Sequence, residues 1–214
     1  MALELIVFDC DGVILESVDA KTRAFGRVGA EFGQEAADRL VMYHSMHGGV
    51  SRSEKFAWLF KEFMGREITE AENTALCDRF ASYCLEEVCR SALVPGVMDV
   101  LTAWEGRVPM YVASGTPHEE LEQVLERSGL ARFFDGMYGF PPGKTDLLRL
   151  ILEKSGASPS STVMIGDSAT DQHAAEAVNT LFYGRGEYFR HSGYPWHDDL
   201  TRLSAYLEEL YRAE

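Results

Sequence analysis

The sequence has few basic residues, no long apolar run and no recognisable leader. Its 20 Lys and Arg stand against 34 Asp and Glu, which gives a formal net charge of −14 at pH 7. Such a charge repels nucleic acids and anionic membranes unless a basic patch overrides it, and no such patch is present. The apolar runs are shorter than the ~20 residues that a membrane span needs, and the N-terminus lacks a signal peptide's basic start. We therefore expect a cytoplasmic protein that binds neither nucleic acid nor membrane.

Metal-binding patterns built on cysteine and histidine are also lacking. The four cysteines are Cys10, Cys77, Cys84 and Cys89. None forms a CxxC pair, which argues against a zinc site, and disulfides are rare in a reducing compartment. His44 and His47 have helical spacing but no third partner, so we interpret them as packing or surface residues. We expect the cysteines to be free thiols that pack as small apolar side chains.

The apolar residues that are present, 46% of the chain, change their periodicity twice. Leu3 to Phe8 form a short apolar run that ends in acids, which is typical of a buried strand opening into a loop. Residues 17–91 show only helical periodicity, and capping boxes at Ser51–Glu54 and Thr69–Glu72 mark two helix starts. This segment predicts a bundle of helices inserted after the first strand.

Beyond residue 91 the pattern of strands and helices resumes. The runs Val108–Ala113 and Thr162–Ile165 are each followed by a loop and then by helical periodicity, which is typical of parallel α/β folds. Thr116 with Pro117 resembles the cap and first position of a helix. We therefore predict an α/β protein with a Rossmann-like parallel sheet. Its core comprises residues 1–16 and 92–214, and its α-helical cap domain comprises residues 17–91.

Polar and small residues follow the predicted strands or begin a helix between them. These residues are Asp9, Asp11, Ser114, Gly115, Lys144, Asp167 and Asp171. Because the carboxyl ends of parallel strands meet at one edge of the sheet, where helix N-termini also point, we expect these residues to form one site. Clustered carboxylates are stable as anions when a hard divalent cation such as Mg²⁺ lies among them. A hydroxyl, a lysine and backbone amides suit the oxygens of a phosphate, and an aspartate can accept a phosphoryl group.

The order and spacing of these residues resemble the haloacid dehalogenase superfamily, in the branch with a helical cap that includes phosphoglycolate phosphatases and β-phosphoglucomutases. The resemblance implies that Asp9 is the nucleophile and Asp11 the general acid and base. It implies that Ser114 and Gly115 bind phosphate and that Lys144 stabilises it. It also implies that Asp9 and Asp167 bind Mg²⁺ with the backbone carbonyl of Asp11, and that Asp171 supports the metal site. It implies a magnesium-dependent phosphatase that hydrolyses a small phosphorylated metabolite through an aspartyl-phosphate.

Two alternatives stay open. Asp11 favours phosphate ester hydrolysis or phosphoryl mutase chemistry, because a proton must reach the departing oxygen. The sugar-phosphate mutase branch has a cap histidine twelve residues after the nucleophile, where this chain has Lys21, so the phosphatase is preferred. The other alternative is a non-catalytic protein of the same fold that binds a phosphorylated ligand. The intact acids argue against it, because a repulsive cluster costs stability.

The predicted cap is expected to choose the substrate. Its stretch Gly48–Glu54 is similar to the substrate-facing loop of the mutase branch. Arg52 falls on the first turn of the following helix, where a cation is mildly unfavourable. It either closes on a phosphate or carboxylate of the substrate or pairs with a neighbouring acid. Lys21 is the second cap candidate, and the sequence indicates neither the substrate's identity nor the oligomeric state.

Overall fold

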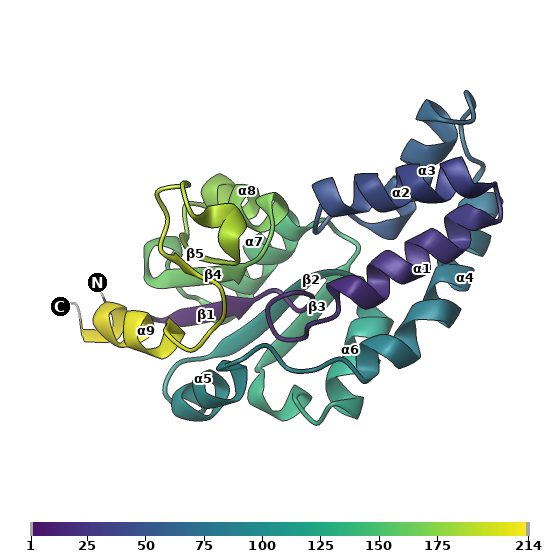
Figure 1. The fold of residues 1–214 in the computed structure, drawn as a ribbon. Helices are drawn as coiled ribbons and strands as arrows, with labels where there is room; N and C mark the ends of the chain where they lie inside the picture. The colour runs from purple at the N-terminus through teal and green to yellow at the C-terminus, as the bar shows by residue number, and fades with distance from the viewer. Residues whose placement is uncertain (1, 213–214) are drawn as a thin grey trace.

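The computed structural model describes residues 2–212 and contains one parallel sheet (Figure 1). Its strands are β1 (Leu5–Phe8), β2 (Met110–Pro117), β3 (Gly136–Phe140), β4 (Thr162–Gly166), β5 (Leu181–Arg185) and β6 (Trp196–His197). They lie in the order β3-β2-β1-β4-β5-β6, and all neighbouring pairs are parallel. This is the strand order of a Rossmann-like sheet, which confirms the predicted fold class. Strand β1 lies between β2 and β4, so the loops after these three strands are neighbours.

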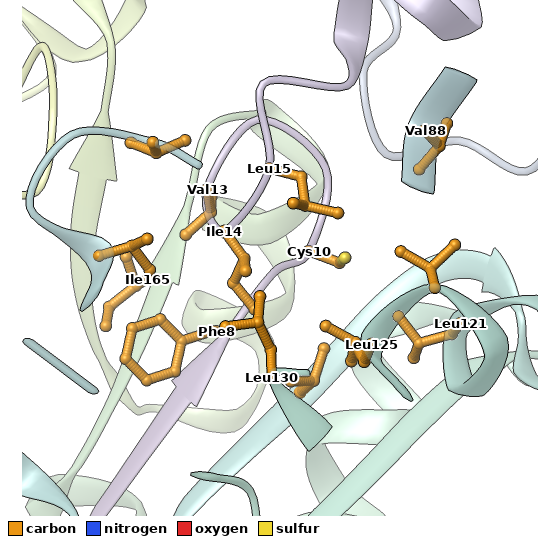
Figure 2. Packing of buried hydrophobic residues seen from close by; sticks show 14 of the residues in the cluster. Phe8, Cys10, Val13, Ile14, Leu15, Val88, Leu121, Leu125, Leu130 and Ile165 are labelled. Atoms are coloured by element: carbon orange, nitrogen blue, oxygen red, sulfur yellow. The ribbon is translucent and has the colours of Figure 1, made fainter. Parts of the chain in front are cut away.

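The two faces of the sheet are covered by different helices. Alternate residues of a strand point to opposite faces: Ile6 and Phe8 pack in one apolar cluster, and Leu5 and Val7 in another. The helices are α5 (Val97–Trp104), α6 (His118–Arg127) and α9 (Leu203–Arg212) on the first face, and α7 (Lys144–Ser155) and α8 (Ala169–Val178) on the second. Figure 2 shows part of the first cluster, including Phe8 of β1 and Leu130.

Between β1 and β2 the described chain forms only helices. They are α1 (Val18–Ala30), α2 (Gln34–Met46), α3 (Arg52–Glu62) and α4 (Glu70–Cys89). Both predicted capping boxes are present, at the starts of α3 and α4. In Figure 1 the four helices form a group beyond the carboxyl end of β1. We propose that they are the cap of residues 17–91, inserted in a core of residues 1–16 and 92–214.

The proposed cap and core share apolar contacts as well as a chain connection. Cys84 and Val88 of α4 belong to the same buried cluster as Leu121 and Val124 of α6. The cap is therefore packed against the core at α6, and its remaining boundary faces the carboxyl edge of the sheet. Within the described part of the chain, no helix has the length and apolar character that a bilayer crossing requires.

Candidate active site

A cavity of about 240 Å³ lies between the carboxyl edge of the sheet and the cap helices. Six of the predicted site residues line it: Asp9, Asp11, Lys21, Arg52, Gly115 and Asp167. The other three, Ser114, Lys144 and Asp171, are buried and do not line it. The structure therefore brings the predicted residues of the core and the proposed cap to one place. Six of them face the cavity, and three are buried and do not line it.

Asp9 follows β1 directly and is only 3% exposed. Its Oδ1 accepts a hydrogen bond from the backbone amide of Cys10 at 2.7 Å, and its Oδ2 lies 2.9 Å from Nζ of Lys144. Burial raises the pKa of Asp9 to about 7, although Lys144 acts in the opposite direction. The carboxylate is thus fixed in orientation by two donors and lies at the wall of the cavity.

Lys144 begins α7 and bridges two carboxylates. Its Nζ lies 2.9 Å from Asp9 and 2.5 Å from Oδ1 of Asp171. Burial opposes the charge, but Asp171 and Asp9 together raise the pKa of Lys144 above its ordinary value. Asp171 also accepts hydrogen bonds from the amide and the hydroxyl of Ser168, at 3.1 and 2.6 Å. Asp171 is therefore fixed by α8 and holds the ammonium of Lys144 beside Asp9.

Three carboxylates of the core could hold a metal ion. Asp9, Asp167 and Asp171 each place one oxygen within 4.8 Å of the others. Burial, and after it the charges of Asp9 and Asp171, raise the pKa of Asp167 well above its usual range. Gly12, at φ +77°, makes room for Asp167, because a Cβ there would lie 2.0 Å from its Oδ2. A cation among these acids would stabilise their charged forms, and a set of hard carboxylate oxygens fits Mg²⁺.

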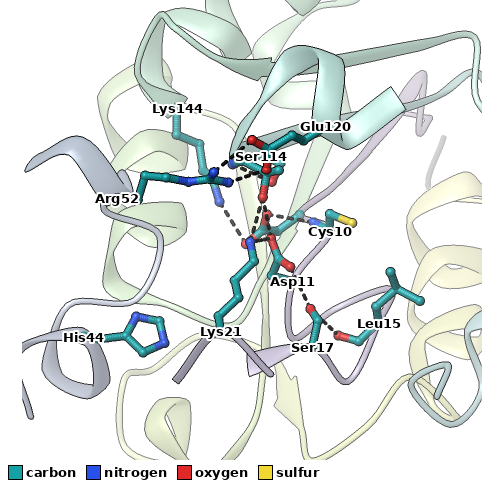
Figure 3. Close-up of polar contacts among 12 residues, drawn as sticks. Cys10, Asp11, Leu15, Ser17, Lys21, His44, Arg52, Ser114, Glu120 and Lys144 are labelled. Carbon is teal, nitrogen blue, oxygen red and sulfur yellow. Dashed lines mark hydrogen bonds and ion pairs between the residues drawn. The ribbon is translucent and has the colours of Figure 1, made fainter. Parts of the chain in front are cut away.

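The side chain of Asp11 turns toward the cap (Figure 3). It accepts hydrogen bonds from the hydroxyls of Ser17 and Thr116, at 2.6 and 2.9 Å, and from the ammonium of Lys21. Burial alone would raise the pKa of Asp11, but Lys21 and the two hydroxyls lower it to about 2. Asp11 is therefore an ionised acceptor, and its carboxylate belongs to the cap side of the cavity.

The end of strand β2 contains Thr116, where we predict a helix cap. Strand β2 continues to Pro117, which occupies the N-cap position of α6 without a side-chain cap bond. The hydroxyl of Thr116 donates to Asp11 and accepts from Lys21 at 2.7 Å. Ser114 is fully buried, and its Oγ accepts from the amide of Thr116 at 3.1 Å. Thr116 is thus a site residue that the sequence analysis missed, because Thr before Pro is also typical of a helix start.

The two predicted cap cations are both paired with core acids. Arg52 is 8% exposed and makes a bidentate ion pair with Glu120 of α6, with nitrogen to oxygen distances of 2.8 and 2.5 Å. Lys21 is paired with Asp11. Arg52 is therefore neither a surface residue nor a partner of Glu54. In this conformation both cations join the cap to the core, and their predicted contact with substrate stays a prediction.

Lys55 and His44 of the proposed cap also line the cavity, and the sequence analysis missed both as site residues. Lys55 of α3 is 2% exposed, and its Nζ lies 2.8 Å from Nδ1 of His44 of α2. A signal for Lys55 was available, because it lies three residues after Arg52 and one before Phe56, on the face of α3 that is buried. A lysine at an apolar position of a helix needs a specific reason.

Comparisons with known proteins agree with this arrangement. Phosphoglycolate phosphatase 1 of Pseudomonas aeruginosa is 28% identical over 204 residues, which cover 84% of this chain and 70% of that protein. A phosphorylated carbohydrates phosphatase of Thermotoga maritima is 27% identical, with 82% of each chain covered. The crystal structure of a β-phosphoglucomutase from Clostridium difficile has the same fold, with a TM-score of 0.82, 18% identity, and 98% of this chain and 97% of that chain covered.

The family comparison covers most of the core and all of the proposed cap. The model of the haloacid dehalogenase-like hydrolases matches residues 3–179. That range contains every residue of the candidate site, from Asp9 to Asp171. The chain belongs to the haloacid dehalogenase-like hydrolase family.

Proposed function

We propose that the protein is a magnesium-dependent phosphatase that hydrolyses a small phosphomonoester through a phosphoryl group carried on Asp9. The observation that carries the proposal is the setting of Asp9, a buried carboxylate between Lys144 and Asp167 at the wall of the cavity. A small phosphorylated metabolite as substrate is in keeping with the named phosphatases among the relatives.

The reaction has two steps in which Asp9 and Asp11 have different roles. Asp11 is ionised while Lys21 is paired with it, so the first step requires that Lys21 moves away when substrate binds and that Asp11 takes up a proton. A carboxylate oxygen of Asp9 then attacks phosphorus, the bond from phosphorus to the leaving oxygen breaks, and Asp11 gives that oxygen its proton. Next, a water oxygen attacks phosphorus, Asp11 takes a proton from the water, and the bond to Asp9 breaks to release inorganic phosphate. Asp11 thus regains in the second step the proton that it gives in the first.

The remaining residues stabilise charge around this reaction. Lys144 lies beside Asp9 and offsets negative charge on the transferring phosphoryl group. Asp9 and Asp167, with the backbone carbonyl of Asp11 that the family resemblance implies, would hold Mg²⁺. When bound, the ion supplies positive charge that neutralises the phosphoryl oxygens. Gly115 lines the cavity, and the family resemblance implies that its backbone binds the phosphate.

A phosphoryl mutase would use the same residues, and the likeness to a β-phosphoglucomutase concerns the fold alone. Lys21 argues for the phosphatase, since it occupies the position of the mutase histidine and is already paired with Asp11. Purified protein should be incubated with Mg²⁺ and a panel of phosphorylated metabolites, with release of inorganic phosphate as the readout. Isomerised sugar phosphate without phosphate release would establish the mutase instead, and no release from any ester, including p-nitrophenyl phosphate, would contradict the proposal.

A further inference from the structure

We infer that Lys55, held by His44, binds a second anionic group of the substrate on the cap side of the cavity. The substrate is then a small phosphomonoester that also carries a carboxylate or a second phosphate. This inference rests on the proposed function and adds the chemical class of the substrate to it. It is carried by the burial of Lys55, by its partners and by its place in the cavity.

Lys55 differs from the other cations of the site in having no carboxylate partner. Lys144 bridges two carboxylates, and Lys21 and Arg52 each pair with one. Among residues 2–212, the polar contact of the Lys55 ammonium is His44, and no carboxylate oxygen lies within 4.0 Å of it. Burial, and after it the charge of Lys21, lower the pKa of Lys55 to about 7. A buried ammonium without an anion is costly, and an anion bound beside it would remove that cost.

His44 is the neutral partner that holds Lys55. Burial, with Lys55 and Lys21, lowers the pKa of His44 to about 3, so the ring is neutral. When the Lys55 ammonium donates to Nδ1, the proton of the neutral ring must be on Nε2. That Nε2 is buried, so a ligand in the cavity does not reach it, and a contact with the backbone carbonyl of Val18 acts to raise the pKa of the ring. Figure 3 shows the His44 side chain reaching toward Lys21. His44 therefore holds the Lys55 ammonium at the cavity, where an anionic oxygen of the substrate could accept a hydrogen bond from Lys55.

The position of Lys55 suits a substrate with two charged ends. The charges of Asp11 and Asp167 both act on Lys55, so it lies within electrostatic range of the core acids that line the same cavity. Its ammonium is 5.2 Å from the centre of the Phe25 ring, which also lines the cavity. An anionic tail is repelled by the carboxylates on the core side and attracted by Lys55 on the cap side. The two ends of the cavity therefore favour a phosphoryl group near Asp9 and a second anion at the cap.

The test compares esters that differ only in the second anion. One pair is 2-phosphoglycolate and ethyl phosphate; the other is fructose 1,6-bisphosphate and fructose 1-phosphate. For each pair we take the kcat/KM value of the ester with the second anion and divide it by that of the ester without it. This ratio is measured in wild type, Lys55→Met, Lys55→Arg and His44→Phe. Lys61→Met is the matched control, because Lys61 is an exposed lysine of the same helix. The aromatic ring in His44→Phe keeps the packing against Phe25.

We expect one ratio to fall at least tenfold in Lys55→Met, chiefly through KM, and to fall in His44→Phe as well. Lys55→Arg should keep more of the ratio than Lys55→Met, and Lys61→Met should keep all of it. The pair that loses its ratio shows whether the second group is a carboxylate or a phosphate. The inference is overturned if wild type prefers neither anionic ester, or if Lys55→Met and Lys55→Gln fold and keep both ratios.

A binding measurement separates this inference from the proposed function. Calorimetric titration of the Asp9→Asn protein with 2-phosphoglycolate, ethyl phosphate and the two fructose phosphates needs no turnover. If one anionic ester binds at least tenfold more tightly than its partner, and Lys55→Met removes the difference, the inference holds even where hydrolysis fails. If p-nitrophenyl phosphate is hydrolysed but neither preference appears in rate or binding, the proposed function stands and the role of Lys55 is wrong.

Discussion

Asp9 and Asp11 are two residues apart, yet their pKa values are displaced in opposite directions. Burial raises the pKa of Asp9 to about 7, whereas Lys21 and two hydroxyls outweigh burial and lower that of Asp11 to about 2. The difference arises from their neighbours: Asp9 faces the acids of the core and Asp11 faces the cap. The proposed roles need the opposite order, so a cation beside Asp9 must lower its pKa, and the release of Lys21 from Asp11 must raise the pKa of Asp11.

The proposed nucleophile is tested by Asp9→Asn. The amide has nearly the same shape as the carboxylate but cannot attack phosphorus, so kcat for p-nitrophenyl phosphate should fall at least about 1000-fold. One carboxylate fewer in the cluster should leave the melting temperature equal or higher. Hydrolysis and thermal melting are measured side by side, with the exposed Asp146→Asn as control. Most of the activity remaining in Asp9→Asn would exclude Asp9 as the nucleophile.

The charge of Lys55 predicts a pH dependence of stability. Its pKa is about 7 in the folded protein and 10.5 ordinarily, so between these pH values the unfolded chain binds the extra proton. The free energy of unfolding therefore rises with pH across this window, by on the order of 4 kcal/mol for this group. Lys55→Met lacks this contribution. Urea denaturation measures the free energy of unfolding of both proteins at pH 7 and pH 9.5. The value for wild type minus that for Lys55→Met should be larger at pH 9.5, and an equal difference at both pH values would contradict a buried ammonium.

Residues next to strand ends could be predicted from the sequence, and residues that reach the site from a distance could not. Asp9 and Asp167 follow apolar runs, so topology alone places them at one edge of the sheet. Lys55 and His44 come from two different helices, and a local sequence pattern does not predict how two helices pack against each other. Thr116 has a pattern that also fits a helix cap, and only the extension of β2 to Pro117 shows its other use.

The loop that joins α2 to α3 lies directly on the core. The hydroxyl of Thr170, in the first turn of α8, donates to the carbonyl of Gly48 at 2.7 Å. Gly49 has a φ of +76°, and a Cβ there would lie 2.8 Å from the Cβ of Thr170. The carbonyl oxygen of Gly49 would be 2.7 Å from a Cβ at Gly115. Backbone therefore meets backbone at the edge of the cavity, which only glycines permit.

Gly49→Ala should loosen this contact. The substitution introduces both backbone strain of ~1–2 kcal/mol and a collision with Thr170. Gly65→Ala is the matched control: its φ is +68°, but a Cβ there would have nothing within 4 Å. We expect both variants to lose similar backbone stability, and only Gly49→Ala to lower kcat/KM, by tenfold or more. Equal kcat/KM values in the two variants would show that the loop does not need to sit on the core.

Regular elements with a strong period were predictable, and short or glycine-containing ones were not. The strands at both edges of the sheet were missed: β3 contains Gly136 and Gly139, and β6 is two residues long. Neither offers the apolar alternation that marks a strand. The start of the closing helix α9 is set by a local turn: the helix begins at Leu203, and just before it Asp199 accepts hydrogen bonds from the amide and hydroxyl of Thr201.

Magnesium should stabilise the folded protein, because a ligand that binds only the folded state raises its stability. At a concentration 100 times its dissociation constant the gain is about 2.7 kcal/mol. The melting temperature should therefore rise with Mg²⁺ and return to its initial value with a chelator, in parallel with activity. Asp167→Asn removes one of the three clustered carboxylates and should abolish the rise. Full activity in excess chelator, or an equal rise in Asp167→Asn, would contradict the proposed metal site.

The cluster that joins α4 to α6 predicts how the protein unfolds. Buried apolar residues continue from the proposed cap into the core. If either part unfolded alone, apolar side chains of the other part would become exposed to water. We expect a single cooperative transition, with equal calorimetric and van't Hoff enthalpies. Scanning calorimetry in the absence of metal tests this, and two separate transitions would show that cap and core are independent.

The cavity gathers buried cations inside a protein whose net charge is −14. A phosphorylated anion that diffuses toward the molecule meets repulsion at long range and attraction only after it enters, near Lys55. At 0.1 M salt, charges more than ~10 Å apart are screened, so added salt weakens the outer repulsion more than the inner attraction. The association rate of the substrate should therefore increase with moderate ionic strength, the reverse of an enzyme that steers its substrate by surface charge.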